Sequence, residues 1–205
     1  MNVIIEVYMK LVKNLSKIKG FNGWMIAKAE FKTAQLNNCT AVVQTEKTET
    51  LRQRSNYSAI ASKAVHNGIE YMLIMHIARP CRDSLAENTA ASISIKGDYL
   101  FTLKYTNKDI KQFIKDSGDS NYIHQTNTPV VPGFLIFRDI INKLSLEKMH
   151  ESCVNTGQIN CIMYFKTPAF ADESIDLFKT DNSRFELILS KRKAMYGKGI
   201  YNRRS

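Results

Sequence analysis

The sequence predicts an α+β protein in which one order of elements, a helix followed by β-strands, occurs twice. Apolar residues recur at helical spacing over residues 3–19 and again over residues 134–146. Each stretch precedes segments in which apolar and polar residues alternate and β-branched and aromatic types are frequent. Two short matches support an internal duplication: Val7-Tyr8-x-x-Leu11-Val12 aligns with Ile136-Phe137-x-x-Ile140-Ile141, and Glu30-Phe31-Lys32-Thr33-Ala34 aligns with Tyr164-Phe165-Lys166-Thr167-Pro168.

The composition allows a sizeable core and gives the chain a strongly basic character. It has 205 residues, of which 44% are hydrophobic, and a formal net charge of +10. Such a charge fits either a basic solvated surface or attraction to an acidic partner. Lys and Arg are spread along the chain apart from residues 191–193 and 203–204, and the common nucleic-acid-binding motifs are absent. We therefore expect no nucleic-acid partner.

Targeting and metal-binding signals are also absent from the sequence. No segment approaches the roughly 18 uncharged apolar residues of a membrane span, and the first 19 residues carry charges at helical intervals. We therefore expect a soluble, cytoplasmic protein. The cysteines lack a C-x-x-C pair or a histidine at ligand spacing, which argues against a structural zinc site or a disulfide framework. They are Cys39, Cys81, Cys153 and Cys161.

The first copy begins with the helix at residues 3–19, which Gly20 is placed to stop. Strands are predicted at 24–33, 40–50 and 70–78, while the polar stretch 51–67 fits a continued strand pair or a loop. Residues 81–92 have the composition of a linker. They divide an N-terminal unit, residues 1–80, from a C-terminal unit, residues 93–205.

The second copy has two additional elements before its long helix. Residues 93–105 predict a strand or strand pair, and residues 107–115 a short helix capped by Thr106 or Asn107. The long helix at 134–146 follows. Further strands are then predicted at 158–167, 174–179, 185–193 and 195–201.

The stretch before the long helix has the residues of an acid–base site. Asp119 and His124 lie five residues apart in a turn rich in Gly, Asn and Ser, and Pro132-Gly133 begins the apolar helix. A carboxylate and an imidazole can exchange protons with a substrate, because imidazole titrates near neutrality. The backbone N–H of Gly133, at a helix N-terminus, can stabilise a developing negative charge on a carbonyl oxygen.

These residues resemble the motifs of hotdog-fold thioester hydratases and dehydratases. Ser117-Gly118-Asp119-x-Asn121-x-Ile123-His124 is similar to the S-G-D-x-N-P-I/L-H motif of MaoC-like (R)-specific enoyl-CoA hydratases. Residues 129–136, Pro-Val-Val-Pro-Gly-Phe-Leu-Ile, resemble the P-V-x-P-G-x-L-I segment of β-hydroxyacyl-acyl-carrier-protein dehydratases. Residues 165–173 are similar to a strand and turn of the MaoC-like branch, F-x-x-P-v-f-x-G-D.

The resemblance implies a double hotdog fold and a fatty-acid lyase that needs no metal or redox cofactor. Asp119 and His124 would form the catalytic pair, Gly133 would be the oxyanion donor, and Phe134 would face the acyl chain. Asn121 would bind substrate or shape the turn. The substrate would be an acyl-CoA or acyl carrier protein thioester. Since the first copy lacks the motif, we expect one site per chain, in a pseudo-dimeric monomer or a homodimer.

Several positions depart from these families and leave alternatives open. Tyr122 replaces the usual Pro, Pro132 replaces a His, and the segment from His124 to Gly133 is short, as in the carrier-protein branch. Glu6 is a reserve candidate for the glutamate of that branch. A catalytically silent acyl-thioester-binding subunit and a thioesterase therefore remain alternatives.

Overall fold

A computed structural model describes residues 3–36, 47–79, 97–149 and 158–204, and it confirms the α+β class. The described helices are α1 (Val3–Ser16), α2 (Asn107–Ser117) and α3 (Gly133–Met149), with a short 3-10 helix, η2 (Tyr122–His124). The first four strands are β1 (Met25–Gln35), β2 (Lys47–Gln53), β3 (Tyr57–His66) and β4 (Ile69–Ala78). The others are β5 (Asp98–Lys104), β6 (Gln158–Phe165), β7 (Ser174–Lys179), β8 (Arg184–Leu189) and β9 (Ala194–Arg204).

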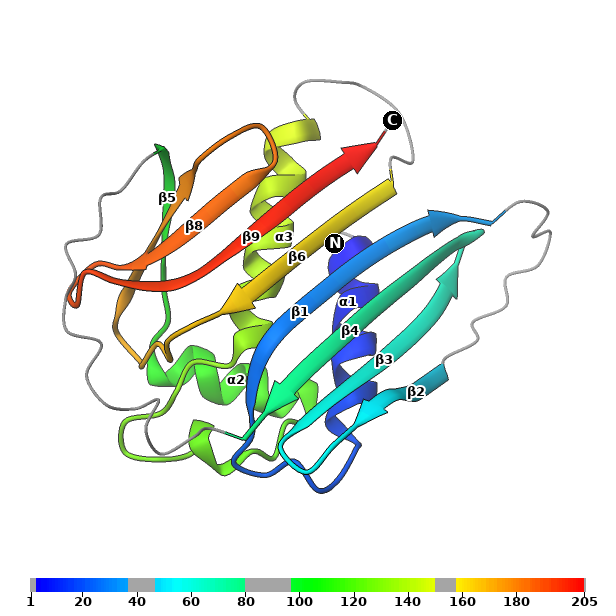
Figure 1. Cartoon of the computed structure of the whole chain (residues 1–205), viewed down its shortest axis with the longest axis horizontal. Helices are drawn as coiled ribbons and strands as arrows, with labels where there is room; N and C mark the ends of the chain where they lie inside the picture. The colour runs from blue at the N-terminus through cyan, green and yellow to red at the C-terminus, as the bar shows by residue number, and fades with distance from the viewer. Residues whose placement is uncertain (1–2, 37–46, 80–96, 150–157, 205) are drawn as a thin grey trace.

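One antiparallel sheet runs through the whole described molecule, in the order β2-β3-β4-β1-β6-β9-β8-β7-β5. The sheet curves in front of the three helices in the view of Figure 1, with α1 and α3 side by side behind its centre. Strands β1 and β6 pair from Lys28 opposite Tyr164 to Lys32 opposite Asn160. This central pair joins the strands that follow α1 to the strands that follow α3.

The order of elements repeats as the sequence predicts. Helix α1 is followed by four strands, β1 to β4, and α3 is followed by four strands, β6 to β9, while β5 and α2 precede α3. The proposed linker at residues 81–92 lies outside the described residues. The division into units 1–80 and 93–205 therefore stays a prediction, although the sheet itself is continuous across it.

The core lies between the sheet and the two long helices. The apolar stripe of α1 and that of α3 are both buried there. Tyr8 connects them, because its ring meets the edges of Phe31 at 5.6 Å and Phe137 at 6.2 Å between centroids. Its hydroxyl donates a hydrogen bond of 2.9 Å to the carbonyl of Phe134, and burial raises the pKa of that phenol. The start of α3 is thus held against α1.

Element ends differ from the predicted ones where local turn chemistry takes over. Helix α1 ends at Ser16 and not at residue 19, since the next backbone N–H groups bond three residues back, and Gly20 follows with a φ of +97°. Thr106 caps α2, with a reciprocal bond to Asp109. The predicted strand at 185–193 ends at residue 189, because a turn containing Lys193 at a φ of +46° separates β8 from β9.

The face of the sheet opposite the helices carries a charged cluster on β1 and β4. Glu30 accepts from Lys28 at 2.7 Å, from Lys32 at 2.8 Å and from Nε2 of His76 at 3.0 Å. The hydroxyl of Tyr57 lies 2.6 Å from Nδ1 of the same imidazole. Burial alone would raise the pKa of Glu30, but the two ammonium groups outweigh it and lower that pKa to about 2.

Candidate active site

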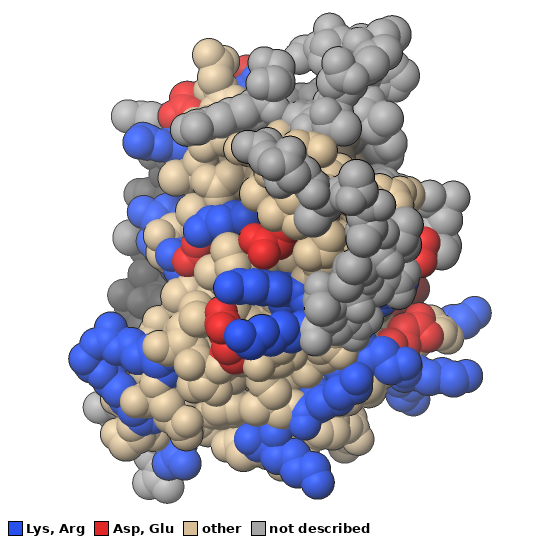
Figure 2. Space-filling model, turned by 90° about the vertical axis from the view of Figure 1, so that its right-hand side faces the viewer, with Lys and Arg blue, Asp and Glu red and all other residues tan. Residues whose placement is uncertain are grey.

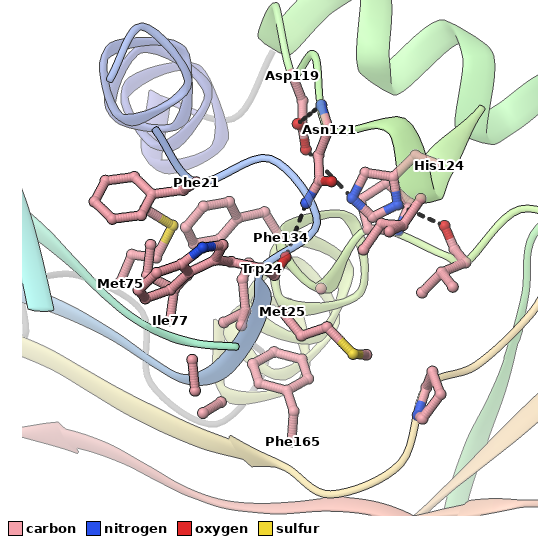
Figure 3. A pocket seen from close by; sticks show the side chains of 18 of the residues that line it. Phe21, Trp24, Met25, Met75, Ile77, Asp119, Asn121, His124, Phe134 and Phe165 are labelled. Carbon is pink, nitrogen blue, oxygen red and sulfur yellow. Dashed lines mark hydrogen bonds and ion pairs between the residues drawn. The ribbon is translucent and has the colours of Figure 1, made fainter. Parts of the chain in front are cut away.

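A largely apolar pocket of about 900 Å³ lies between the first and second copies of the helix-and-strand unit. Its wall combines the α1–β1 loop, the starts of β1 and α3, the end of β4, and the turn after α2. Figure 3 shows aromatic and sulfur-containing side chains below and three polar side chains above. The apolar lining includes Phe21, Trp24, Met25, Met75, Ile77, Phe134 and Phe165, and the polar group consists of Asp119, Asn121 and His124.

The structure brings Asp119 and His124 together at the pocket wall. Gly118 ends α2 with a φ of +71°, which turns the chain toward the pocket. Asp119 Oδ1 then accepts from the backbone N–H of Asn121 at 2.9 Å. Its second oxygen, Oδ2, lies 3.5 Å from Nε2 of His124. The carboxylate is therefore held by one oxygen and presents the other to the imidazole.

The opposite nitrogen of His124 fixes the tautomer of the ring. Nδ1 lies 2.7 Å from the carbonyl oxygen of Val130. Since a carbonyl can only accept, Nδ1 carries the hydrogen, and in the neutral ring Nε2 has a free lone pair. That lone pair and the Asp119 Oδ2, 3.5 Å apart, are both acceptors, so in this tautomer they do not bond to each other and both can accept from a third group. One water or substrate hydroxyl placed beside the pair on the pocket side could bond to both atoms.

Asn121 links this turn to the α1–β1 loop of the other copy. Its Oδ1 accepts from the backbone N–H of Gly23 at 2.9 Å, and its Nδ2 donates to the carbonyl of Trp24 at 2.8 Å. The next residue adds a third bond, from the backbone N–H of Tyr122 to Oδ1 of Asn22 at 3.0 Å. Because both polar ends of the Asn121 side chain are engaged, the observed contacts are those of a residue that shapes the turn.

The first turn of α3 forms part of the same pocket wall as Asp119 and His124. Gly133 and Phe134 both line the pocket. A Cβ on Gly133 would lie 3.1 Å from Cε1 of Phe165 and 3.5 Å from Cδ1 of Ile26. Glycine thus lets β6 and β1 approach the backbone at the start of α3, where N–H groups are without intrahelical acceptors.

Basic residues surround the mouth of the pocket. Lys17, Lys19, Arg79 and Lys166 belong to its lining, in which Asp119 is the one acidic residue among those described. Figure 2 views the β2 side of the molecule and shows Lys and Arg gathered at its lower end, the end at which the α1–β1 loop lies in Figure 1. Arg79 lies over the ring of Trp24, 5.2 Å from its centroid. An anionic ligand would meet a favourable potential at this mouth.

Sequence reasoning placed five residues at the site, and all five line this one pocket: Asp119, Asn121, His124, Gly133 and Phe134. Glu6, the reserve candidate, is not among them. It lies outside the pocket lining on an exposed face of α1, where it pairs with Lys10 at 3.4 Å. The sequence analysis did not identify Asn22 and Trp24 as site residues. The one sequence signal in this segment is a predicted turn, from Gly20 and Gly23 beside two aromatic residues.

The described residues contain neither a candidate metal site nor a candidate membrane span. No group of three or more His, Cys, Asp or Glu there could hold a metal ion. None of the described helices has the length and apolar character needed to cross a membrane. Cys161 is the one cysteine that the structure describes, and it is buried and free.

Comparison of the whole structure with solved structures identifies the fold. HtdX from Mycobacterium tuberculosis superimposes with a TM-score of 0.63 and 12% identity, over 98% of this chain and 86% of that one. A MaoC-like dehydratase from Phytophthora capsici gives a TM-score of 0.58 and 15% identity, over 92% and 75% of the two chains. The fold is a hotdog fold.

The hotdog fold alone does not select one chemistry. A putative thioesterase from Novosphingobium aromaticivorans also superimposes, with a TM-score of 0.53 and 8% identity, over 98% of this chain and 86% of that one. No sequence-family model and no curated protein sequence matches the chain. The choice among activities within the hotdog fold therefore depends on the residues of the pocket.

Proposed function

We propose that the chain interconverts 2-enoyl and (R)-3-hydroxyacyl thioesters, as a hydratase or dehydratase in lipid metabolism. The observation that carries the proposal is the pairing of Asp119 Oδ2 with His124 Nε2 at the wall of a large apolar pocket. The pocket can take an acyl chain, and the pair can hold the water that is added or removed.

The chemistry follows from the hydrogen-bond partners of the pair. During hydration, the water oxygen bonds to C3 of the enoyl thioester while Asp119 and His124 accept one of its protons. The pair delivers one proton to C2, so the reaction adds one water with no net proton change. The carbonyl of Val130 keeps the lone pair of His124 on Nε2, where the water binds. The backbone N–H at Gly133 stabilises the enolate oxygen, an arrangement that can contribute about 3 kcal/mol.

The rim of the pocket supports a thioester carried on phosphopantetheine. This arm is present in both coenzyme A and acyl carrier protein, and it has phosphate at the end away from the thioester. Lys17, Lys19, Arg79 and Lys166 provide cations at the mouth while the lining deeper in is apolar. Such a charge arrangement fits a ligand that is anionic at one end and apolar at the other.

Hydration of crotonyl-CoA tests the proposal, and the decrease in enoyl absorbance measures its rate. We expect Asp119→Asn and His124→Ala to lower turnover by about 100-fold or more each, the scale of positioned acid–base catalysis. Asp116→Asn and His66→Ala are matched controls of the same residue types outside the pocket lining. Equal rates for all five proteins would refute the assignment.

Two further measurements, thiol release and acyl-CoA binding, separate the alternatives. Release of free thiol from a saturated acyl-CoA, lost in the His124 variant, would favour a thioesterase, which the fold also accommodates. Tight acyl-CoA binding with neither reaction would favour a catalytically silent binding subunit. Hydration that depends on His124 is the result that we expect.

A further inference from the structure

Residues 20–24, the second part of the α1–β1 loop, belong to the copy that lacks the Asp119–His124 motif, yet this part of the loop is bonded directly to that motif. Three hydrogen bonds of 2.8–3.0 Å connect it to Asn121 and Tyr122, across 97 to 100 residues of sequence. The Tyr122 ring also covers Gly23, since a Cβ there would lie 3.1 Å from its Cε1. Gly23, with a φ of +79°, allows this close approach.

The same loop forms part of the apolar wall. Phe21 and Trp24 line the pocket and pack edge to face with 5.1 Å between their centroids. Trp24 is buried, and its backbone N–H bonds to the carbonyl of Phe21 at 3.0 Å. One side of this short turn therefore lines the pocket, and the other side is hydrogen-bonded to the Asp119–His124 motif.

We propose that Asn22 is a positioning residue that couples the acyl pocket to the acid–base pair, an inference that rests on the proposed function. Its side chain fixes Tyr122, whose neighbour Asn121 in turn holds Asp119 Oδ1 by a backbone bond of 2.9 Å. An acyl chain that packs against Trp24 stabilises the same loop from inside the pocket. Occupancy of the pocket and placement of the Asp119 carboxylate are thus linked through one turn.

The coupling predicts a dependence on acyl-chain length. In Asn22→Ala, a short crotonyl chain leaves the loop less fixed, so kcat falls by roughly threefold to tenfold, the scale of one neutral hydrogen bond. A 2-decenoyl chain reaches the wall and replaces part of the lost restraint, so its kcat falls less. Overall destabilisation would lower both rates by the same factor.

A second variant removes the same hydrogen bond from the other partner. Asn121 has φ −65° and ψ 119°, a conformation compatible with a following proline. Tyr122→Pro therefore deletes the N–H that bonds to Asn22 while the turn is kept. We expect the double variant with Asn22→Ala to be no worse than the poorer single one, as a shared interaction requires. Asn22→Asp retains the acceptor oxygen and restores turnover to within about twofold of wild type.

The single tryptophan of the chain, Trp24, gives a readout that does not depend on turnover. We expect Asn22→Ala to increase acrylamide quenching of its fluorescence, and decanoyl-CoA to reverse the increase more than butyryl-CoA does. Asp181→Ala is the control, since it removes side-chain bonds to backbone N–H groups in the β7–β8 turn. It should change neither quenching nor turnover.

The outcomes separate the inference from the proposed function. Unchanged quenching in Asn22→Ala would overturn the inference, and so would equal loss of kcat for both chain lengths. Absence of turnover in the wild type, with quenching that responds as expected, would refute the proposed function while the link between loop and pocket stands.

Discussion

Substitution of Gly133 by alanine tests how closely the start of α3 is packed against the sheet. The new methyl would lie 3.1 and 3.3 Å from two carbons of the Phe165 ring and 3.5 Å from Ile26. Carbon atoms prefer about 3.5–4.0 Å, so the ring or the helix start must move by a few tenths of an ångström. Overpacking of this kind costs about 1–3 kcal/mol, whereas alanine gains about 0.5–1 kcal/mol over glycine in a helix. We expect a net loss of about 1 kcal/mol.

Two measurements on the Gly133→Ala variant separate packing from catalysis. The midpoint temperature of thermal unfolding should fall by about 2–4 °C, as a loss of about 1 kcal/mol in the free energy of unfolding implies for a chain of this size. Turnover of crotonyl-CoA should fall by roughly threefold to tenfold, because a displaced N–H meets the enolate oxygen less well. Adding Phe165→Leu removes the ring edge and should restore both quantities in part. A variant more stable than wild type with unchanged turnover would refute the reasoning.

Three further predictions concern stability and ligand binding. Since the folded-state pKa of Glu30, about 2, lies below the unfolded value, its paired carboxylate stabilises the protein above pH 4.5. That contribution is about 1–3 kcal/mol after allowance for the partly exposed lysines, and it is lost as pH falls from 4.5 to 2. Urea denaturation of wild type and Glu30→Gln across this pH range measures it. Tyr8→Phe removes the bond to the Phe134 carbonyl and should cost about 1 kcal/mol in the same assay. Arg79→Ala should weaken binding of acyl-CoA at low salt, with a difference that shrinks at high ionic strength in calorimetric titrations.

The parts of the site that the sequence predicts are the parts whose geometry is local. Asp119 and His124 are five residues apart, so the turn after α2 and the 3-10 helix bring them near each other before any distant contact is made. Gly133 follows within ten residues and begins a helix that its own apolar pattern defines. The fold class was predictable for a similar reason, since helical and alternating patterns are short-range properties of the chain.

Contacts between distant segments were beyond prediction from the sequence. Asn22 meets Tyr122 only because β1 and β6 pair at the centre of the sheet and bring the two copies together. His76 lies between Tyr57 and Glu30 only through the register of three neighbouring strands. A single sequence contains no signal for either register or for the relative position of the copies.

The two copies therefore contribute different parts of one pocket. The second copy supplies Asp119, His124 and the start of α3, whereas the first supplies the aromatic wall at Phe21 and Trp24. Asn121 lies between them and bonds to both, through its backbone to Asp119 and through its side chain to residues 23 and 24. A substitution in the first copy can thus disturb the acid–base pair while every residue of the recognisable motif is intact. The motif alone therefore does not define the geometry around Asp119, because the turn that follows it is bonded to a loop about 100 residues away in the sequence.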